Sequence, residues 1–248
     1  MEPPIFYAPP DQLLNDTVEL PRTESHHALT VMRLKPAAIV MVVDGVGNAC
    51  RGEILAGGKE NVRVRVHSRR RDFGEPAVRL TLAAGLSIAS KFDEIVEKGT
   101  ELGVKRFVPI ISEKSKVRIE DASRARAKVT RLEKVALAAM KQCRRSYRPE
   151  ISVPVNLEQF LREVDRESLN LIFVPSKPSR PLDQLKIESG TKRATVLVGP
   201  EAGFSDEEVD QAIAAGFIPV SMGSRILRAE NAAPVACALV MHALGELS

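Results

Sequence analysis

The amino-acid sequence predicts an α/β protein of two domains, a small β-rich N-terminal domain followed by a larger domain built on a parallel sheet. Three observations lead to this prediction. Apolar and polar residues alternate in strand-like segments before residue 70, short apolar runs alternate with helical patterns after residue 78, and a charged stretch at residues 68–76 separates the two regions. A chain of 248 residues is long enough for two modest domains. We place the boundary near Asp72, between domains of residues 1–72 and 73–248.

Two segments predict strands in the N-terminal domain. Residues 39–43 are an apolar run that enters a turn at Asp44-Gly45, and residues 61–67 alternate in polarity with period two. Gly45 and Gly47 begin like a dinucleotide-binding fingerprint, but the third glycine is missing and another strand follows. A hairpin turn explains both glycines, and we expect a small barrel or sandwich.

Five short apolar runs predict buried parallel strands in the second domain. The helical pattern after the first run ends at Gly103, a good C-terminal stop, and a long basic helix is expected over residues 121–145. We place Pro234 in the first turn of the final helix, where a missing N–H is tolerated. The predicted strands are residues 80–84, 107–111, 171–174, 195–198 and 217–220.

Composition limits the cellular context and the chemistry. Apolar residues make up 44% of the chain and charged residues 27%, as in ordinary globular proteins. No apolar stretch approaches the roughly 18–20 residues of a membrane span, and the N-terminus lacks the features of a signal peptide, so we expect a cytoplasmic protein with no membrane partner. The three cysteines lie too far apart for a short-range metal motif, and His26-His27 has no third ligand nearby. We expect no metal site.

Basic residues are concentrated in one segment. Between Lys105 and Glu150 there are fourteen Lys or Arg against five Asp or Glu, a net charge of +9 in a protein whose total is +4. Such a block can be the electrostatic footprint for a polyanion such as nucleic acid. A solvated helix face rich in Arg and Lys explains it equally well, and the sequence leaves both interpretations open.

Loops containing glycine or proline follow three of the predicted strands. Residues 199–204 come after the strand 195–198, and Ser205 with Glu208 then forms a capping box that starts a helix. Residues 221–231 follow the next strand, and Val174-Pro175-Ser176 ends an earlier one. In open α/β sheets, ligands bind at the carboxyl ends of the strands. We therefore expect the three loops together to enclose one small ligand, although each alone is explained as a turn.

These motifs resemble those of a known family. Residues 199–205 (Gly-Pro-Glu-Ala-Gly-Phe-Ser) and 222–230 (Met-Gly-Ser-Arg-Ile-Leu-Arg-Ala-Glu) are similar to the signature of the SPOUT-class methyltransferases, specifically the ribosomal RNA small-subunit methyltransferase E family. Residues 97–104, 112–115 and 26–35 match that family too. The resemblance covers essentially the whole chain, and the first two motifs are specific in combination.

The resemblance implies a fold, an activity and partners. The fold is an N-terminal PUA-like RNA-binding β-barrel and a C-terminal SPOUT domain tied in a trefoil knot, which periodicity alone never predicts. The activity is S-adenosylmethionine-dependent methylation of N3 of a uridine in 16S ribosomal RNA of the small subunit, carried out by a homodimer. By its motifs, the cofactor pocket falls on Val174, Pro175, Gly199, Glu201, Gly203, Met222, Gly223, Ile226, Leu227 and Arg228.

Arg228 and Glu230 are the candidate catalytic residues. A guanidinium offers paired donors that can stabilise charge developing on the carbonyl oxygens beside N3. Glu230 could orient that arginine, accept the proton, or be only an acid favourably placed at a helix N-terminus, and solvent is another candidate for the base. We expect RNA to be held by the basic segment and the barrel, through Arg33, Lys114, Lys116, Arg144 and Arg145.

Some residues depart from the family's pattern. Ala202 replaces a usual glycine, Met222 a leucine and Asn231 a threonine, while Ala37 lies where a glycine-aspartate turn is usual. Two alternatives follow. One is a non-catalytic RNA-binding or ribosome-assembly factor with a decayed cofactor pocket, and the other is a related SPOUT enzyme that methylates another base or a ribose. The retained glycines and Arg228 favour the active uridine methyltransferase.

Overall fold

The computed structural model describes residues 2–55, 61–86, 91–115, 121–175 and 179–247. The chain forms two compact units, one of Met1–Glu75 with Leu137–Arg148 and one of Pro76–Ala136 with Pro149–Ser248. The predicted boundary after residue 72 therefore lies slightly too early. It also misses the segment Leu137–Arg148, which the sequence assigned to the second domain.

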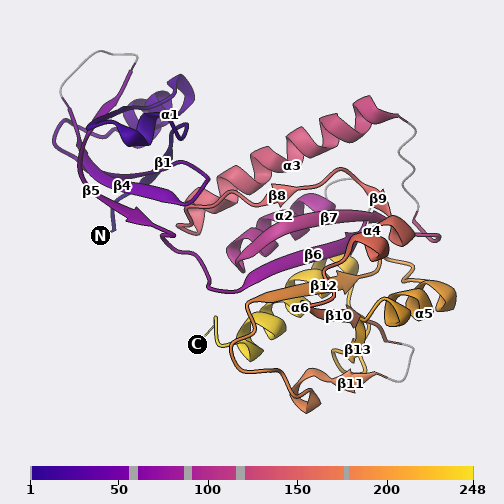
Figure 1. The fold of residues 1–248 in the computed structure, drawn as a ribbon. Helices are drawn as coiled ribbons and strands as arrows, with labels where there is room; N and C mark the ends of the chain where they lie inside the picture. Colours follow the sequence, from indigo (N-terminus) through magenta and orange to yellow (C-terminus); the bar gives the residue numbers. More distant parts are fainter. Residues whose placement is uncertain (1, 56–60, 87–90, 116–120, 176–178, 248) are drawn as a thin grey trace. The chain divides into compact units, whose positions relative to one another are not determined.

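The first unit is built on a sheet with the strand order β1-β3-β4-β5-β2 (Figure 1). The predicted hairpin is present between β3 and β4, where Gly45 and Gly47 have left-handed φ angles of 76° and 101°. Phe6, Val42 and Val64 are fully buried in its core. Its elements are β1 (Ile5–Tyr7), η1 (Gln12–Leu14), β2 (Thr17–Glu19), α1 (Arg22–His26), η2 (His27–Val31), β3 (Ile39–Val43), β4 (Asn48–Ile54) and β5 (Arg63–Arg71).

The end of helix α3 (Ala122–Gln142) completes this unit. Met140 is fully buried against Met41, Val43 and Ala49, and Leu137 packs against the same cluster. This apolar contact explains why Leu137–Arg148 groups with the N-terminal residues. Helical periodicity predicts which face of a helix is apolar, but it does not predict which part of the protein packs against each turn of that face.

The second unit contains a parallel sheet with the order β11-β13-β10-β12-β6-β7-β8, and β9 also pairs with β7. All five predicted strands are present. The additional strands β8, β9 and β11 have two residues each, too few to show a period. The strands are β6 (Arg79–Gly85), β7 (Val104–Ile111), β8 (Glu150–Ile151), β9 (Val155–Asn156), β10 (Leu169–Phe173), β11 (Arg180–Pro181), β12 (Arg193–Val198) and β13 (Ile218–Ser221).

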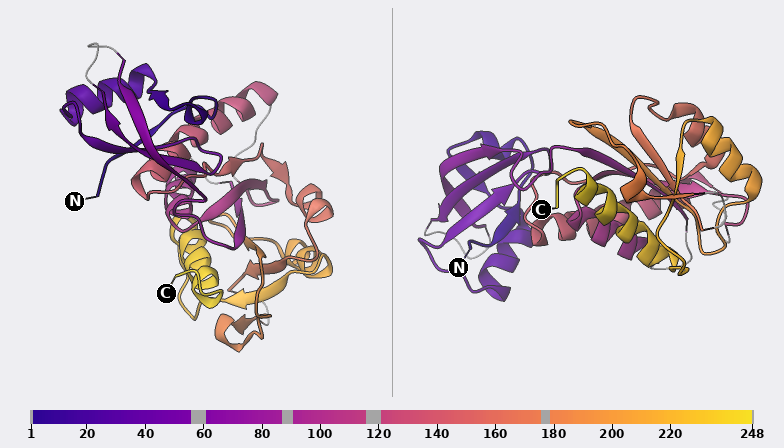
Figure 2. Two further views of the ribbon diagram at one scale, coloured as in Figure 1. Left: turned by 60° about the vertical axis from the view of Figure 1, so that its left-hand side comes forward. Right: turned by 90° about the horizontal axis from the view of Figure 1, so that it is seen from below.

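Helices cover both faces of this sheet (Figures 1 and 2). Leu80 and Leu82 of β6 pack in one cluster with α2, α3 and α6, whereas Ala83 packs in another with α4 and α5. Burial on both faces is why these strands are mostly apolar. The remaining helices are α2 (Lys91–Glu101), α4 (Leu157–Glu163), η3 (Leu182–Gln184), α5 (Asp206–Ala214) and α6 (Ala229–Ala243).

Helix ends confirm one prediction and correct two. Gly103 follows α2 with a φ of 89°, as expected of a helix stop. The basic helix ends at Gln142, before the predicted residue 145, and Arg144 has a left-handed φ of 66°. Pro234 lies inside α6 rather than in its first turn, because the helix already begins at Ala229. None of the described helices is long and apolar enough to cross a membrane.

Candidate functional site

The loops that follow β10, β12 and β13 line one cavity of about 620 Å³ at the carboxyl ends of these strands. This is where the sequence predicted a ligand, and the volume lies within the roughly 300–1,000 Å³ typical of small-molecule sites. The predicted cofactor residues that line it are Val174, Pro175, Gly199, Glu201, Gly203, Met222, Gly223, Ile226 and Leu227.

Glycines allow the loop after β12 to turn tightly beside the cavity. A Cβ atom on Gly199 would lie 3.1 Å from Cα of Gly203, so the two ends of the turn touch. The backbone N–H of Gly203 donates to the carbonyl of Pro200 at 2.8 Å. Gly203 has a φ of 69°, and a Cβ atom there would meet open space. At Gly203 the turn therefore presents backbone rather than a side chain to the cavity.

Glu208 anchors both the start of α5 and a neighbouring loop. Its Oε2 accepts from the N–H of Ser205 at 2.8 Å and the Ser205 Oγ accepts from the N–H of Glu208, which confirms the predicted capping box. Its Oε1 accepts from the N–H of Glu113 at 2.8 Å, while Lys114 Nζ donates to the carbonyl of Phe204 at 3.2 Å. Glu113 and Lys114 are thereby held at the cavity, which both of them line.

Two carboxylates share the ammonium group of Lys91. Its Nζ lies 3.3 Å from Oε1 of Glu201 and 3.6 Å from Oε1 of Glu230. A hydrogen bond from the backbone N–H of Glu230 itself, together with the charge of Lys91, lowers the pKa of the Glu230 carboxyl. The other oxygen, Oε2, is buried and has no hydrogen-bond partner among the described residues. Glu230 is therefore an ionised acceptor at neutral pH.

Lys91 is not among the residues predicted from the sequence. Asp93 and Glu94 follow it in the first turn of α2, so its charge has acidic neighbours in the chain and gives no signal of distant partners. Its partners Glu201 and Glu230 come from distant segments.

Arg225 and Arg228 occupy different positions. Arg225 lines the cavity, whereas Arg228 is not among the lining residues found in the described part of the chain. Arg228 is the exposed N-cap residue of α6, and its charge contributes to the lowered pKa of Glu230. The sequence motif drew attention to Arg228, and nothing in its spacing distinguished Arg225.

The predicted RNA-binding residues are divided between the two units. Lys114 belongs to the second unit, Arg33, Arg144 and Arg145 belong to the first, and Lys116 lies outside the described residues. Arg33 is exposed, and Arg144 is partly exposed with its Nε 3.0 Å from Oε2 of Glu2.

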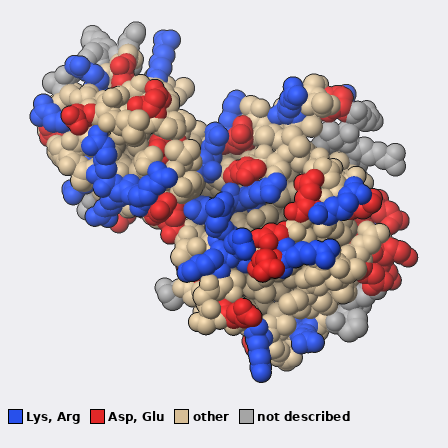
Figure 3. All heavy atoms as spheres, in the orientation of Figure 1, with Lys and Arg blue, Asp and Glu red and all other residues tan. Residues whose placement is uncertain are grey.

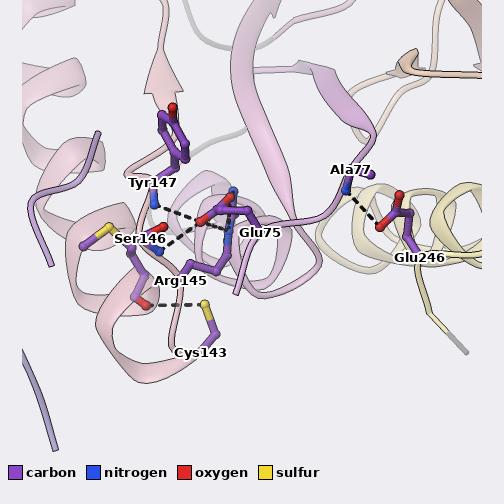
Figure 4. Close-up of polar contacts among 8 residues, drawn as sticks. Glu75, Ala77, Cys143, Arg145, Ser146, Tyr147 and Glu246 are labelled. Atoms are coloured by element: carbon purple, nitrogen blue, oxygen red, sulfur yellow. Dashed lines mark hydrogen bonds and ion pairs between the residues drawn. The ribbon is translucent and has the colours of Figure 1, made fainter. Parts of the chain in front are cut away.

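Arg145 requires a correction. Its side chain is only 2% exposed, and its guanidinium donates to both carboxylate oxygens of Glu75 (Figure 4). A buried guanidinium already paired with a carboxylate is not available to a phosphate, so the expectation that Arg145 contacts RNA is wrong.

Exposed basic side chains occur on both units (Figure 3). On α3, Arg131 pairs with Asp93 at 2.7 Å and Arg124 with Asp121 at 3.5 Å, so part of the basic block forms local ion pairs. This supports the solvated-face interpretation for that part of α3. Strand β5 adds a basic run that the sequence analysis did not single out: Arg63, Arg65, Arg69, Arg70 and Arg71 are all exposed.

Within the described part of the chain, no group of three or more His, Cys, Asp or Glu side chains is placed to hold a metal ion. His26 and His27 are exposed at the junction of α1 and η2.

The fold is that of an RNA methyltransferase. Residues 74–241 match the family model of an RNA methyltransferase domain, and residues 20–66 match that of an RNA methyltransferase PUA domain. The chain belongs to the ribosomal RNA small subunit methyltransferase E family. It is 33% identical over 235 residues to the family's protein from Synechocystis, an alignment that covers 93% of this chain and 75% of that relative.

Solved structures agree with this membership. A methyltransferase from Legionella pneumophila in complex with its cofactor S-adenosylmethionine superposes with a TM-score of 0.87 at 29% identity, covering 98% of both chains. Ribosomal RNA small subunit methyltransferase E from Neisseria gonorrhoeae, bound to S-adenosylmethionine, gives a TM-score of 0.86 at 27% identity with the same coverage. The predicted α/β fold with an N-terminal PUA-like domain is thereby confirmed, while the trefoil knot stays a prediction.

Proposed function

We propose that this protein transfers the methyl group of S-adenosylmethionine to N3 of a uridine in 16S ribosomal RNA of the small ribosomal subunit. The observation that carries the proposal is the cavity at the ends of β10, β12 and β13, lined by the two motifs that are specific to the family in combination. Its relatives are named for small-subunit ribosomal RNA, and two similar solved structures hold S-adenosylmethionine.

The lining of the cavity suits this cofactor. Val174, Met222 and Leu227 offer apolar contacts for the faces of an adenine ring, and the backbone of the 199–203 turn offers donors and acceptors for its polar edges. The carboxylate of Glu201 is an acceptor for ribose hydroxyls or an ammonium group. When bound, the cofactor supplies an electrophilic methyl group. Ala202 also lines the cavity without closing it, which does not favour a decayed pocket.

The chain's own residues account for the activation of the nucleophile. Uridine N3 forms the new N–C bond as the S–C bond breaks, and the N3 proton must leave. Arg228 lies outside the cavity lining, so we assign it to the RNA, where it stabilises negative charge on the carbonyl oxygens that flank N3. The lowered pKa keeps Glu230 ionised at neutral pH, and the charge of Arg228 contributes to that lowering. Glu230 therefore balances the charge of Arg228, and the N3 proton leaves to a base in the solvent because Arg228 favours the N3 anion.

We further propose that the active species is a homodimer acting in the cytoplasm, where ribosomal RNA is made. Helix α6 is largely buried, yet Val235 and Leu239 are each 38% exposed and lie one helical turn apart. A two-fold contact would bury this pair against its own copy. Sedimentation should show a dimer that Leu239→Glu converts to a monomer, whereas a wild-type monomer would exclude the proposal.

The position and nature of the methyl group test the activity directly. Ribosomal RNA from cells lacking the protein should lose one methyl group from a uridine, measured by mass spectrometry of nucleosides, and the purified protein should restore it. Because a methyl group on N3 blocks the Watson–Crick edge, reverse transcription of wild-type RNA should stop at that site. Loss of a ribose methyl group would indicate the related enzyme class, and unchanged RNA would indicate a non-catalytic factor.

A further inference from the structure

Three segments that are distant in the sequence converge on one ammonium group. Lys91 begins α2, Glu201 lies in the loop after β12, and Glu230 lies in the first turn of α6. Since Nζ is within 3.6 Å of an oxygen of each carboxylate, Lys91 links the loop after β12 to the first turn of α6. No hydrogen bond between described residues joins that loop to the loop that precedes α6.

The loop before α6 is held by apolar packing rather than by backbone hydrogen bonds, since Met222 and Leu227 pack against the core of the second unit. Among the described residues, no backbone hydrogen bond is found for residues 222–227, four of which carry predicted cofactor contacts. Backbone hydrogen bonds begin just after this segment, where the carbonyl of Arg228 accepts from the N–H groups of Asn231 and Ala232. The ion pair between Lys91 and Glu230 therefore restrains the first turn of α6, which directly follows this loop.

The loop after β12 also approaches the segment that leads to Lys91. A Cβ atom on Gly85, the last residue of β6, would lie within 2.7 Å of Cα of Pro200. Such close backbone approach leaves room only for glycine. The β12 loop is thus packed against the end of β6 on one side and tied to Lys91 through Glu201 on the other.

Charge makes Lys91 hard to replace. The side chains of Lys91, Glu201 and Glu230 are 38%, 30% and 12% exposed. Glu230 is the least exposed to water, so its negative charge depends most on a nearby cation. Without Lys91, two carboxylates would repel each other at the cavity. Lys98 on the same helix differs, because the ion pair found for it among the described residues is an exposed one, with Glu94 one turn away.

We propose that Lys91 is a positioning residue for the methyl transfer, joining the loop of Glu201 to the first turn of α6 so that the cofactor loops, Arg228 and Glu230 keep one arrangement. Lys91 does not contact the reacting atoms. The inference rests on the proposed function and adds a residue that none of the family motifs discussed above contains.

The test uses S-adenosylhomocysteine as a probe of the cavity and small subunits from cells lacking the protein as the methyl acceptor. Lys91→Met keeps the length of the side chain but removes its charge. We expect this variant to bind S-adenosylhomocysteine about five- to tenfold more weakly, as measured by calorimetry. Its kcat should fall as well, because Glu230 loses its ion pair with Lys91. Lys91→Arg should recover most of both losses, and the matched control Lys98→Met should change neither.

A double-mutant cycle separates positioning from a general loss of stability. If Lys91 acts through Glu230, Lys91→Met and Glu230→Gln together should cost little more in kcat than the worse single variant. Additive losses, or a Lys91→Met protein that binds and turns over like Lys98→Met, would overturn the inference. Wild-type protein that fails to bind S-adenosylhomocysteine would instead refute the proposed function. Thermal melting checks the fold, and Lys91→Gln replaces Lys91→Met if the latter does not fold.

Discussion

Arg145 and Glu75 form an ion pair whose side chains are only 2% and 1% exposed. Nη2 of Arg145 lies 2.9 Å from Oε2 of Glu75, and Nε donates to both oxygens (Figure 4). The N–H groups of Ser146 and Tyr147 donate to Oε1 at 3.0 and 2.8 Å. Within the first unit, the carboxylate of Glu75 thereby connects the segment after β5 to the segment after α3 through hydrogen bonds.

Removing one member of this pair should strongly destabilise the protein. Arg145→Ala leaves a buried carboxylate without its cation, and we expect a loss of about 3–5 kcal/mol in the free energy of unfolding, measured with urea. The exposed Arg126→Ala on α3 is the control and should change it by less than about 0.5 kcal/mol. Equal effects of the two substitutions would mean that Arg145 is not buried in solution.

Gly203 and Gly190 allow backbone strain to be separated from blockage of the cavity. Both have left-handed φ angles, 69° and 85°, and a Cβ atom on either would meet open space, but only Gly203 lines the cavity. Gly203→Ala and Gly190→Ala should therefore each cost about 1 kcal/mol of stability. Only Gly203→Ala should weaken S-adenosylhomocysteine binding in calorimetry, by about tenfold, because an extra methyl group in a filled site costs roughly 1–3 kcal/mol. Equal binding by both variants would place the cofactor elsewhere.

Arg228 and Arg225 should respond differently to truncation. Arg228→Ala should lower kcat by about two to three orders of magnitude, as for loss of one oxyanion donor, and leave the Kd of S-adenosylhomocysteine within about tenfold. Arg225 lines the cavity, so Arg225→Ala should mainly raise that Kd. Calorimetry and single-turnover methylation measure the two quantities. If Arg228→Ala weakens S-adenosylhomocysteine binding as much as it lowers kcat, Arg228 is part of the cavity wall.

RNA binding should depend on exposed charges rather than on Arg145. Arg33 is exposed with a left-handed φ of 53°, a conformation that asparagine tolerates, so Arg33→Asn removes the charge with little strain. We expect this substitution, and Lys114→Gln, each to lower the slope of log affinity against log salt by about 1. Filter binding at several salt concentrations measures the slope, with Lys98→Gln as the control. An unchanged slope would show that the residue does not face a phosphate.

The three cysteines should differ in reactivity. Burial raises the pKa of the Cys50 thiol to about 11 and also raises that of Cys237, so both stay protonated at pH 8 and react only as the pH rises toward their pKa values. Cys143 is partly exposed. A thiol reagent at pH 8 should therefore modify one cysteine quickly in the native protein and three in denaturant. Fast modification of Cys50 would contradict its burial.

Several features could be predicted because the residues that cause them are neighbours in the chain. Strands buried on both faces are mostly apolar, so β6 and β12 were recognisable as short runs rich in Leu, Val and Ala. The Ser205–Glu208 capping box spans one helical turn. The position of the loops at strand ends then followed from the general geometry of parallel sheets.

The sequence alone thus determined the two-domain α/β organisation, the strands of the parallel sheet and the loops that line its cavity. Only the tertiary structure decided that Leu137–Arg148 completes the first unit, that Arg145 is buried against Glu75, and that Lys91 bridges Glu201 and Glu230. The reason is physical. Periodicity and capping depend on neighbours a few residues apart, whereas the partner of a charged side chain depends on which distant segments pack together; Glu75 and Arg145 are 70 residues apart in the chain.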